Sequence, residues 1–385
     1  MKEGYIMTLT KKESAWQFYT FFLPLTIFVA SSYFHTFQSF FDYLEIFATF
    51  LLVLGCMKKF CLFNKKNKIL FLLLMGLFGT VFLSSRDITV IKFYLFFFSA
   101  YGINFRECVK WDLRVRITCY ILVIMLNILG IIPSNNISRA GEVRYSLGFS
   151  HPNNLAAMTF LMLFELYYIK KFKYELSTLI LTIISIVFLN IVTDSRTSEL
   201  LIILTYILGT LVCNVRIQKQ HKNIKSFLQF LIKNSYFIIS AIIFLLYLCY
   251  RYNISIGLFA DKLLSYRLYY IDAYYQKFNI SFFGNNFVGF VSKKNPLDIG
   301  YAHILIRYGL VAFVLIGLAF KKMFKKLFEM NRKELIVIMI SFIIYCVTEN
   351  GMLRIEQNIF MILFLLIFPS QNNIYSLELK DATTV

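Results

Sequence analysis

The sequence predicts an all-α polytopic membrane protein, folded as a single integral membrane domain over residues 1–385. Hydrophobic residues make up 58% of the 385 residues and charged residues only 16%. A soluble core could not hold so much apolar surface. The apolar residues form about twelve runs that approach the length a helix needs to cross the hydrocarbon layer. Basic residues cluster between these runs, as the positive-inside rule expects of cytoplasmic loops.

The expected transmembrane helices follow the apolar runs in chain order. They are 17–32, 41–57, 69–83, 88–103, 117–132, 155–169, 176–192, 200–213, 235–250, 301–320, 335–348 and 353–368. The alternation of basic and less basic loops places the segment 214–234 in the cytoplasm and the segments 133–154 and 251–300 outside. Both chain termini are then expected on the cytoplasmic side. A loop as long as 251–300 usually has a function, so we expect it to help form a site together with 133–154.

The net charge does not indicate a nucleic-acid partner. The chain has 40 Lys and Arg against 21 Asp and Glu, a net charge of +19, but the basic clusters are explained by membrane topology. The seven Cys show no metal-ligand spacing, and the chain contains neither of the two glycine-rich phosphate-binding motifs that mark nucleotide sites. We therefore expect no metal and no cofactor.

The segment 144–154 carries an Arg, a His, two Asn and two Ser between two apolar runs. Gly148 and the following His-Pro pair interrupt regular structure, so we expect Asn153 or Asn154 near the N-cap of the next helix. The start of such a helix offers side chains and free backbone N–H groups to an anion. An ordinary external loop that only caps the helix is the structural alternative.

Ionisable residues gather on the predicted outer face, where the positive-inside rule disfavours basic residues. They are Arg86, Arg139, Arg144, His151, Arg196, Arg267, Asp298, His303, Arg307, Glu349, Arg354 and Glu356. Because guanidinium groups match phosphate oxygens, this cluster indicates an anionic ligand such as a polyprenyl diphosphate. Alternatively, each Arg pairs with an acid and only joins helices, and Arg307 and Arg354 fit that alternative best.

Few residues on this face can transfer protons. Of the four His, His35 lies in an outer turn without polar neighbours and His221 lies in the basic cytoplasmic segment, which leaves His151 and His303. If a helix begins near Asp298, then His303 and Arg307 are neighbours four residues apart. The charge of Arg307 would keep His303 neutral and able to act as a base. A hydrogen bond to the backbone is an equal alternative for His303.

Several short motifs resemble those of the bacterial polysaccharide repeat-unit polymerases of the Wzy type. They are the segment Arg-Tyr-Ser-Leu-Gly-Phe-Ser-His-Pro-Asn at 144–153, the turn 194–198, the long outer segment 251–300, and Asp298-x-x-Tyr301 with Gly309 after it. The resemblance implies an all-helical GT-C-like glycosyltransferase of the bacterial cytoplasmic membrane, related to the O-antigen ligases. Such enzymes join undecaprenyl-diphosphate-linked repeat units into capsular polysaccharide or exopolysaccharide outside the membrane, without a metal.

The resemblance also implies roles for individual residues. The groups expected to hold the diphosphate or the sugar are Arg144, Arg196, Arg267, Arg139, Asn154, Tyr301 and Arg354. The related ligases are thought to use a His where this chain has Asp298, so Asp298 is the first candidate for the base. His303 is the second, and His151 is a further candidate. The expected partners are the lipid-linked repeat units, membrane lipid, and the flippase and chain-length regulator of the same pathway.

Two other functions remain open. A flippase for lipid-linked sugars or a polysaccharide transporter would carry charged residues along a path at mid-membrane depth. The charges here lie mostly at the outer ends of the spans, and Glu45 and Lys92 are the main exceptions. An O-antigen ligase-like transferase with a different acceptor is the other alternative.

Overall fold

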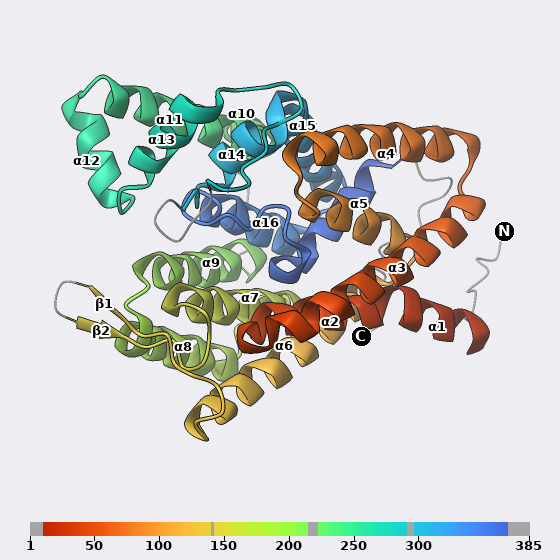
Figure 1. The fold of residues 1–385 in the computed structure, drawn as a ribbon, viewed down its shortest axis with the longest axis horizontal. Coiled ribbons are helices and arrows are strands. Elements are labelled where there is room, and N and C mark those ends of the chain that lie inside the picture. Colours follow the sequence, from red (N-terminus) through yellow and green to blue (C-terminus); the bar gives the residue numbers. More distant parts are fainter. Residues whose placement is uncertain (1–10, 140–141, 215–221, 291–295, 369–385) are drawn as a thin grey trace.

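The computed structural model describes residues 11–139, 142–214, 222–290 and 296–368. Within these residues the fold is almost entirely helical, with one sheet of two antiparallel strands. The structure therefore confirms the all-α prediction. Figure 1 shows α6 to α9 on one side of the molecule and α11 to α14 on the other, with α16 between them. The two expected cytoplasmic termini and part of the basic segment 214–234 lie outside the described residues.

The first half of the chain packs three long helices with shorter ones. Its elements are α1 (Lys11–Gln17), η1 (Phe18–Phe22), α2 (Leu23–Tyr33), η2 (His35–Phe37), α3 (Gln38–Leu62), α4 (Lys65–Ser85), α5 (Thr89–Ser99), α6 (Phe105–Ile128), β1 (Ile137–Arg139), β2 (Glu142–Arg144) and α7 (Pro152–Lys170).

The described residues of the second half are also mostly helical and end in 3₁₀ turns. Its elements are α8 (Leu176–Thr193), α9 (Arg196–Asn214), α10 (Lys222–Lys233), α11 (Ser235–Arg251), α12 (Ser255–Leu263), α13 (Arg267–Phe278), α14 (Gly300–His303), η3 (Ile304–Tyr308), α15 (Gly309–Glu329), α16 (Lys333–Tyr345), η4 (Ile355–Gln357) and η5 (Ile359–Ile367).

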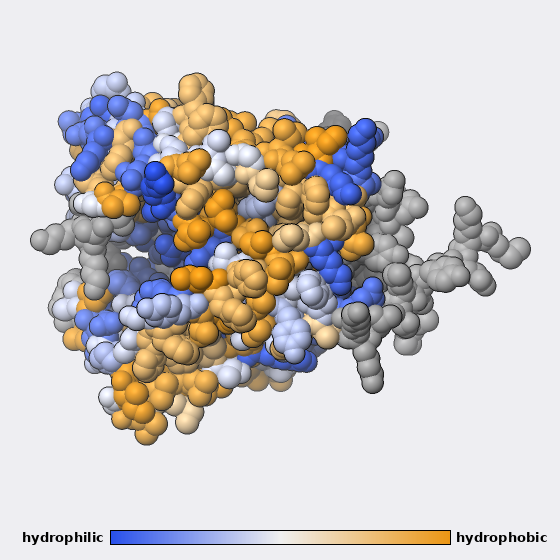
Figure 2. Space-filling model, turned by 45° about the vertical axis from the view of Figure 1, so that its right-hand side comes forward, coloured by the Kyte–Doolittle hydropathy of each residue, from blue (hydrophilic) through white to orange (hydrophobic). Residues whose placement is uncertain are grey.

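Several helices are long and apolar enough to cross a membrane. There are five of these among the described residues, or six if α10 and α11, which meet at 68°, form one span. The five are His35–Leu62, Lys65–Ser85, Leu176–Thr193, Arg196–Asn214 and Gly300–Glu329. Only 17% of the apolar stretch of α4 is buried, so lipid must cover the rest. Figure 2 shows hydrophobic residues over much of the visible surface.

Two segments expected as external loops have regular structure. The segment 251–300 contains α12 and α13, and 133–154 contains a hairpin in which Ile137 pairs with Arg144. The N-cap of α7 is His151, whose ring Nδ1 accepts a hydrogen bond from the Asn153 N–H. Asn153 and Asn154 thus lie in the first turn, near the N-cap as expected, but the cap itself is His151. The helix begins earlier because Pro152 has a backbone conformation suited to the first helical turn.

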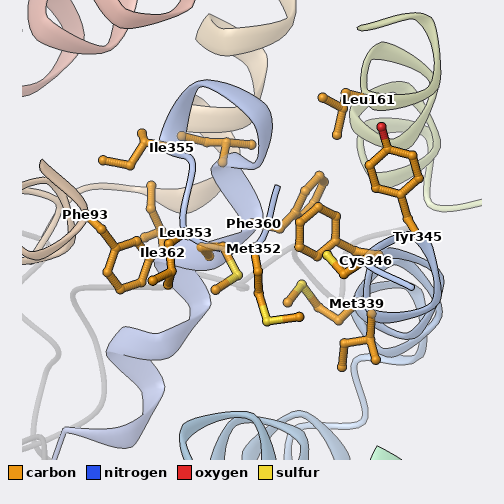
Figure 3. Packing of buried hydrophobic residues seen from close by; sticks show 14 of the residues in the cluster. Phe93, Leu161, Met339, Tyr345, Cys346, Met352, Leu353, Ile355, Phe360 and Ile362 are labelled. Atoms are coloured by element: carbon orange, nitrogen blue, oxygen red, sulfur yellow. The ribbon is translucent and has the colours of Figure 1, made fainter. Parts of the chain in front are cut away.

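The last apolar run, 353–368, is not an α-helix as expected. After α16 ends at Tyr345, the chain continues in the 3₁₀ turns η4 and η5. Figure 3 shows Leu353, Ile355 and Phe360 from this stretch within the packed apolar core. Because both neighbours of Arg354 are buried, this exposed residue is held in place by the core on either side.

A close backbone approach connects the segment after α13 to the start of α15. Gly309 has φ +89, and a Cβ there would lie 2.4 Å from the Phe282 carbonyl oxygen. The Val311 N–H donates to the same carbonyl at 3.1 Å, and the Asn285 N–H donates to the Arg307 carbonyl at 2.9 Å. These contacts fix the backbone that carries Arg307.

We predict that Gly309→Ala destabilises the fold by more than about 1 kcal/mol, because it combines a positive φ with a backbone clash. The matched control is Gly76→Ala, in the exposed middle of α4, where a Cβ meets nothing within 4 Å. Ala is the better helix former, so the control should unfold no earlier than the wild type. Thermal unfolding in detergent measures both, and equal midpoints for the two variants would contradict the prediction.

Candidate functional site

A polar cavity of about 190 Å³ lies among α2, η2, α3, α5, α7 and the chain around η4. Its polar and charged lining consists of Ser31, Ser32, His35, Gln38, Glu45, Thr89, Lys92, Asn154, Arg354, Glu356 and Gln357. The rest of the lining is apolar, including Phe28 and Met158. A cavity with several polar groups inside an apolar bundle is a candidate binding site, because each such group is costly to place there.

One side of the polar cavity is formed by a paired lysine. Lys92 on α5 donates to the Glu45 carboxylate on α3, and this carboxylate also accepts a hydrogen bond from the Ser31 hydroxyl. The Lys92 ammonium lies 5.2 Å from the centre of the Phe28 ring. The lysine is therefore neutralised by its partner and held at a fixed position.

Arg354 is the cation in the polar cavity that has no such partner. Its neighbours Leu353 and Ile355 are 4% and 3% exposed, whereas Arg354 itself is exposed. Among the described residues, the Arg354 guanidinium makes no ion pair and no side-chain hydrogen bond. Its five N–H donors are therefore available to a ligand in the cavity.

A second cavity, of about 30 Å³, adjoins the first at Thr89, Leu353 and Arg354. Arg307 Nε in this cavity lies 2.9 Å from Asp87 Oδ2, and the Tyr308 hydroxyl donates to the same oxygen at 2.8 Å. Burial acts to raise the pKa of Asp87, but the Arg307 charge and its hydrogen-bond donors outweigh burial and hold the pKa below its usual value. Arg307 is thus neutralised within the fold.

His303 lines the second cavity and is buried. Its ring centre lies 5.2 Å from that of Tyr308, and among the described residues its Nδ1 has no hydrogen-bond partner. The chain from 304 to 308 forms a wider π-type turn, in which Arg307 lies over the Phe287 ring at 5.3 Å. The side chains of His303 and Arg307 both line this small cavity.

Arg267, at the start of α13, is held between two carboxylates. Its Nη2 lies 3.1 Å from Glu349 Oε1, and its Nε lies 3.9 Å from Asp298 Oδ2. Burial raises the pKa of Asp298, although Arg267 and Arg354 oppose this. Burial also raises the pKa of Glu349 to about 7 against the attraction of Arg267. The Arg354 charge also acts to lower the pKa of Asp298 and that of Glu349. The two carboxyls therefore lie within the electrostatic field of a residue that lines the polar cavity.

Arg144 and His151 form a separate cluster at the start of α7. Arg144 is buried, with Nε donating to the Thr193 carbonyl and Nη2 donating to Asn153 Oδ1 at 2.8 Å. Burial and the Arg144 charge lower the pKa of His151. The Arg144 guanidinium therefore connects β2, the end of α8 and the first turn of α7.

The predicted site residues thus divide into groups. Arg354, His303 and Asn154 line the two adjoining cavities, and Arg267 and Asp298 lie beside them. Arg196 is remote from these cavities, with 83% of its side chain exposed and Asp194 3.5 Å away. The Tyr301 hydroxyl donates to the Ile343 carbonyl at 2.8 Å within the core.

Arg139 lies in β1, and its side chain is outside the described part of the structure.

The structure adds residues to which the sequence gave no role, namely His35, Lys92, Asp87 and Glu349. Of these, Lys92 had a clear signal, because it is a lone cation within an apolar run.

Comparison of the chain with protein-family models, with curated proteins and with solved structures gave no match. Any function therefore has to be inferred from the residues and geometry of the site.

We predict that Asp87→Asn destabilises the protein by about 2 kcal/mol, because Arg307 loses its counter-charge in a mostly buried place. The control is Asp194→Asn, whose partner Arg196 is exposed, and its effect should stay below about 0.5 kcal/mol. Unfolding curves in detergent give both values.

The pH dependence provides a second check. Because the pKa of Asp87 is lowered by folding, its stabilising effect is present above the ordinary carboxyl pKa and is lost as the pH falls through the folded value. The difference between wild type and Asp87→Asn should therefore shrink below about pH 4. A difference that stays constant down to pH 2 would show that the ion pair is not its cause.

Proposed function

We propose that the chain polymerises undecaprenyl-diphosphate-linked oligosaccharide repeat units into capsular polysaccharide or exopolysaccharide on the outer face of the bacterial cytoplasmic membrane. The observation that supports this most is the unpaired guanidinium of Arg354 in the polar cavity. Arg307 and Arg267 are already paired with acids, so Arg354 is the cation that can accept a new anion. A phosphate group matches the planar fork of a guanidinium.

A lipid-linked substrate also suits the surroundings of the polar cavity. Helix α5 contributes Thr89 and Lys92 to this cavity, while Phe93 and Phe97 of the same helix line an apolar groove of about 200 Å³. The groove is closed by side chains of α4, α15 and η5. A charged head group and an isoprenoid chain would therefore find suitable surroundings on either side of one helix.

In this proposal the chain belongs with the all-helical GT-C-like transferases and crosses the membrane about twelve times. The reaction breaks the bond between the sugar and the diphosphate, which leaves with an additional negative charge. Arg354 stabilises this charge by direct hydrogen bonds. We expect the step to need no metal, because the Arg354 guanidinium supplies the counter-charge of the leaving group.

A flippase for the same lipid is the second candidate, and the Lys92–Glu45 pair within the polar cavity favours it. An O-antigen ligase-like transferase would share the donor site and differ in the acceptor. Cells that lack the gene distinguish the first two functions. Loss of a polymerase leaves single repeats on lipid outside the membrane, whereas loss of a flippase leaves them inside.

We predict that Arg354→Ala lowers the rate of polymer extension at least about 100-fold, as removal of one charge-stabilising donor does in other enzymes. The assay is extension of a purified lipid-linked repeat unit by the purified protein without divalent metal, followed as a ladder on a gel. The control is Lys262→Ala, on an exposed part of α12, which should extend normally. Normal ladders from a folded Arg354→Ala variant would rule out the proposed role of this residue.

A further inference from the structure

We propose that Glu349 is the general base that removes the proton from the acceptor-sugar hydroxyl, with Arg267 and Asp298 as its positioning residues. This inference rests on the proposed polymerase function. It differs from the expectation drawn from the sequence, which placed Asp298 first and His303 second.

The charges around Arg267 support this assignment. One guanidinium lies between two carboxylates, Glu349 at 3.1 Å and Asp298 at 3.9 Å. Among the described residues, neither carboxylate has another ion-pair partner within 4.0 Å. One positive charge cannot neutralise both acids, so this group of three readily takes up one proton near neutral pH.

The two carboxylates differ in their suitability as a base. The side chain of Glu349 is 26% exposed and that of Asp298 is 39% exposed. Arg267 holds Oε1 of Glu349, and Oε2 has no hydrogen-bond partner in the described structure, so this oxygen is available to a substrate hydroxyl. Burial raises the pKa of Glu349 to about 7, and a base is most effective when its pKa is near the working pH.

The backbone places Glu349 next to the anion-binding residue. The hydrogen bond from the Arg354 N–H to the Gly351 carbonyl closes a short turn at 3.2 Å, and Glu349 lies two residues before this turn, with its N–H donating to the Tyr345 carbonyl at 3.1 Å. Asn350, the residue after Glu349, lines the small cavity together with Arg354. The short segment from Glu349 to Arg354 thus carries the group that takes the proton and the group that binds the leaving diphosphate.

The start of α14 fixes this turn from the other side. The Gly300 N–H donates to the Cys346 carbonyl at 2.9 Å, and a Cβ at Gly300 would lie 3.2 Å from the Glu349 carbonyl oxygen. The backbone after Asp298 therefore packs directly against the backbone of Glu349. Asp298 and Glu349 also share Arg267, and through this shared guanidinium Asp298 acts as a positioning residue.

The Glu349 carboxylate takes the proton of the acceptor hydroxyl, and the hydroxyl oxygen forms a bond to the anomeric carbon of the donor sugar. The bond from that carbon to the diphosphate oxygen breaks, and its electron pair leaves on the diphosphate, next to Arg354. The neutral Glu349 then releases its proton to water and the cycle can repeat.

The test is the steady-state kinetics of extension by Glu349→Gln, which keeps the shape of the side chain and an oxygen for Arg267. We expect kcat to fall at least about 100-fold and the KM for the lipid-linked repeat to change less than about 3-fold. The wild-type rate should rise with pH through about 7, since the base must be ionised, and the residual rate of the variant should not. The matched control is Glu329→Gln, at the exposed end of α15.

Three outcomes would overturn the inference. Wild-type kcat in Glu349→Gln would do so, as would a larger loss of kcat in Asp298→Asn than in Glu349→Gln. Absence of any ladder from the wild type would overturn the polymerase function as well, so the two failures can be told apart. If Glu349→Gln does not fold, Glu349→Asp takes its place. This change withdraws the carboxylate by one methylene, and an unchanged kcat would again contradict the role.

Discussion

The structure depends on the way the chain around Arg354 is anchored. The residue is flanked by Leu353 and Ile355, and burial of two such side chains contributes about 3 to 6 kcal/mol to holding this stretch in the core. The stretch runs in 3₁₀ turns where an α-helix would be expected, so Arg354 reaches a polar cavity while both neighbours stay packed. Because the backbone of Arg354 is already fixed, only its side chain loses conformational freedom when it binds a ligand.

The surrounding charges explain why this one cation remains available. Arg307 is paired with Asp87, Arg267 with Glu349 and Lys92 with Glu45. Each pair neutralises a charge that would be costly in an apolar bundle, and the Arg307–Asp87 and Lys92–Glu45 pairs also line the two cavities. Arg354 is left as the cation that can bind a diphosphate as it gains charge and leaves.

The sequence was sufficient for the fold class and for part of the site. Apolar runs determine the helices because backbone groups in lipid must be satisfied within the segment, and this rule needs no knowledge of tertiary contacts. The sequence also indicated which ionisable residues gather, and Arg354, His303 and Asn154 do line adjoining cavities. The roles of individual residues were harder to predict from the sequence. The sequence left two roles open for Arg354, diphosphate binding and helix pairing, and among the described residues it makes no ion pair.

The sequence could not reveal partners that are distant in the chain or belong to the backbone. Arg144 was the leading candidate for an anion, but its guanidinium bonds to the carbonyl of Thr193, 49 residues away. The 3₁₀ turns η4 and η5 were equally hidden, because the run 353–368 is as apolar as a membrane helix. Glu349 received no role, since its raised pKa arises from burial that only the folded chain produces.

The most direct test of the central claim is binding of a short prenyl diphosphate, such as farnesyl diphosphate, to the purified protein by calorimetry. The account predicts binding by the wild type that weakens at least about 30-fold in Arg354→Ala, the equivalent of about 2 kcal/mol for lost charge-assisted hydrogen bonds. Equal affinity of the wild type and Arg354→Ala, or no binding by the wild type, would contradict it.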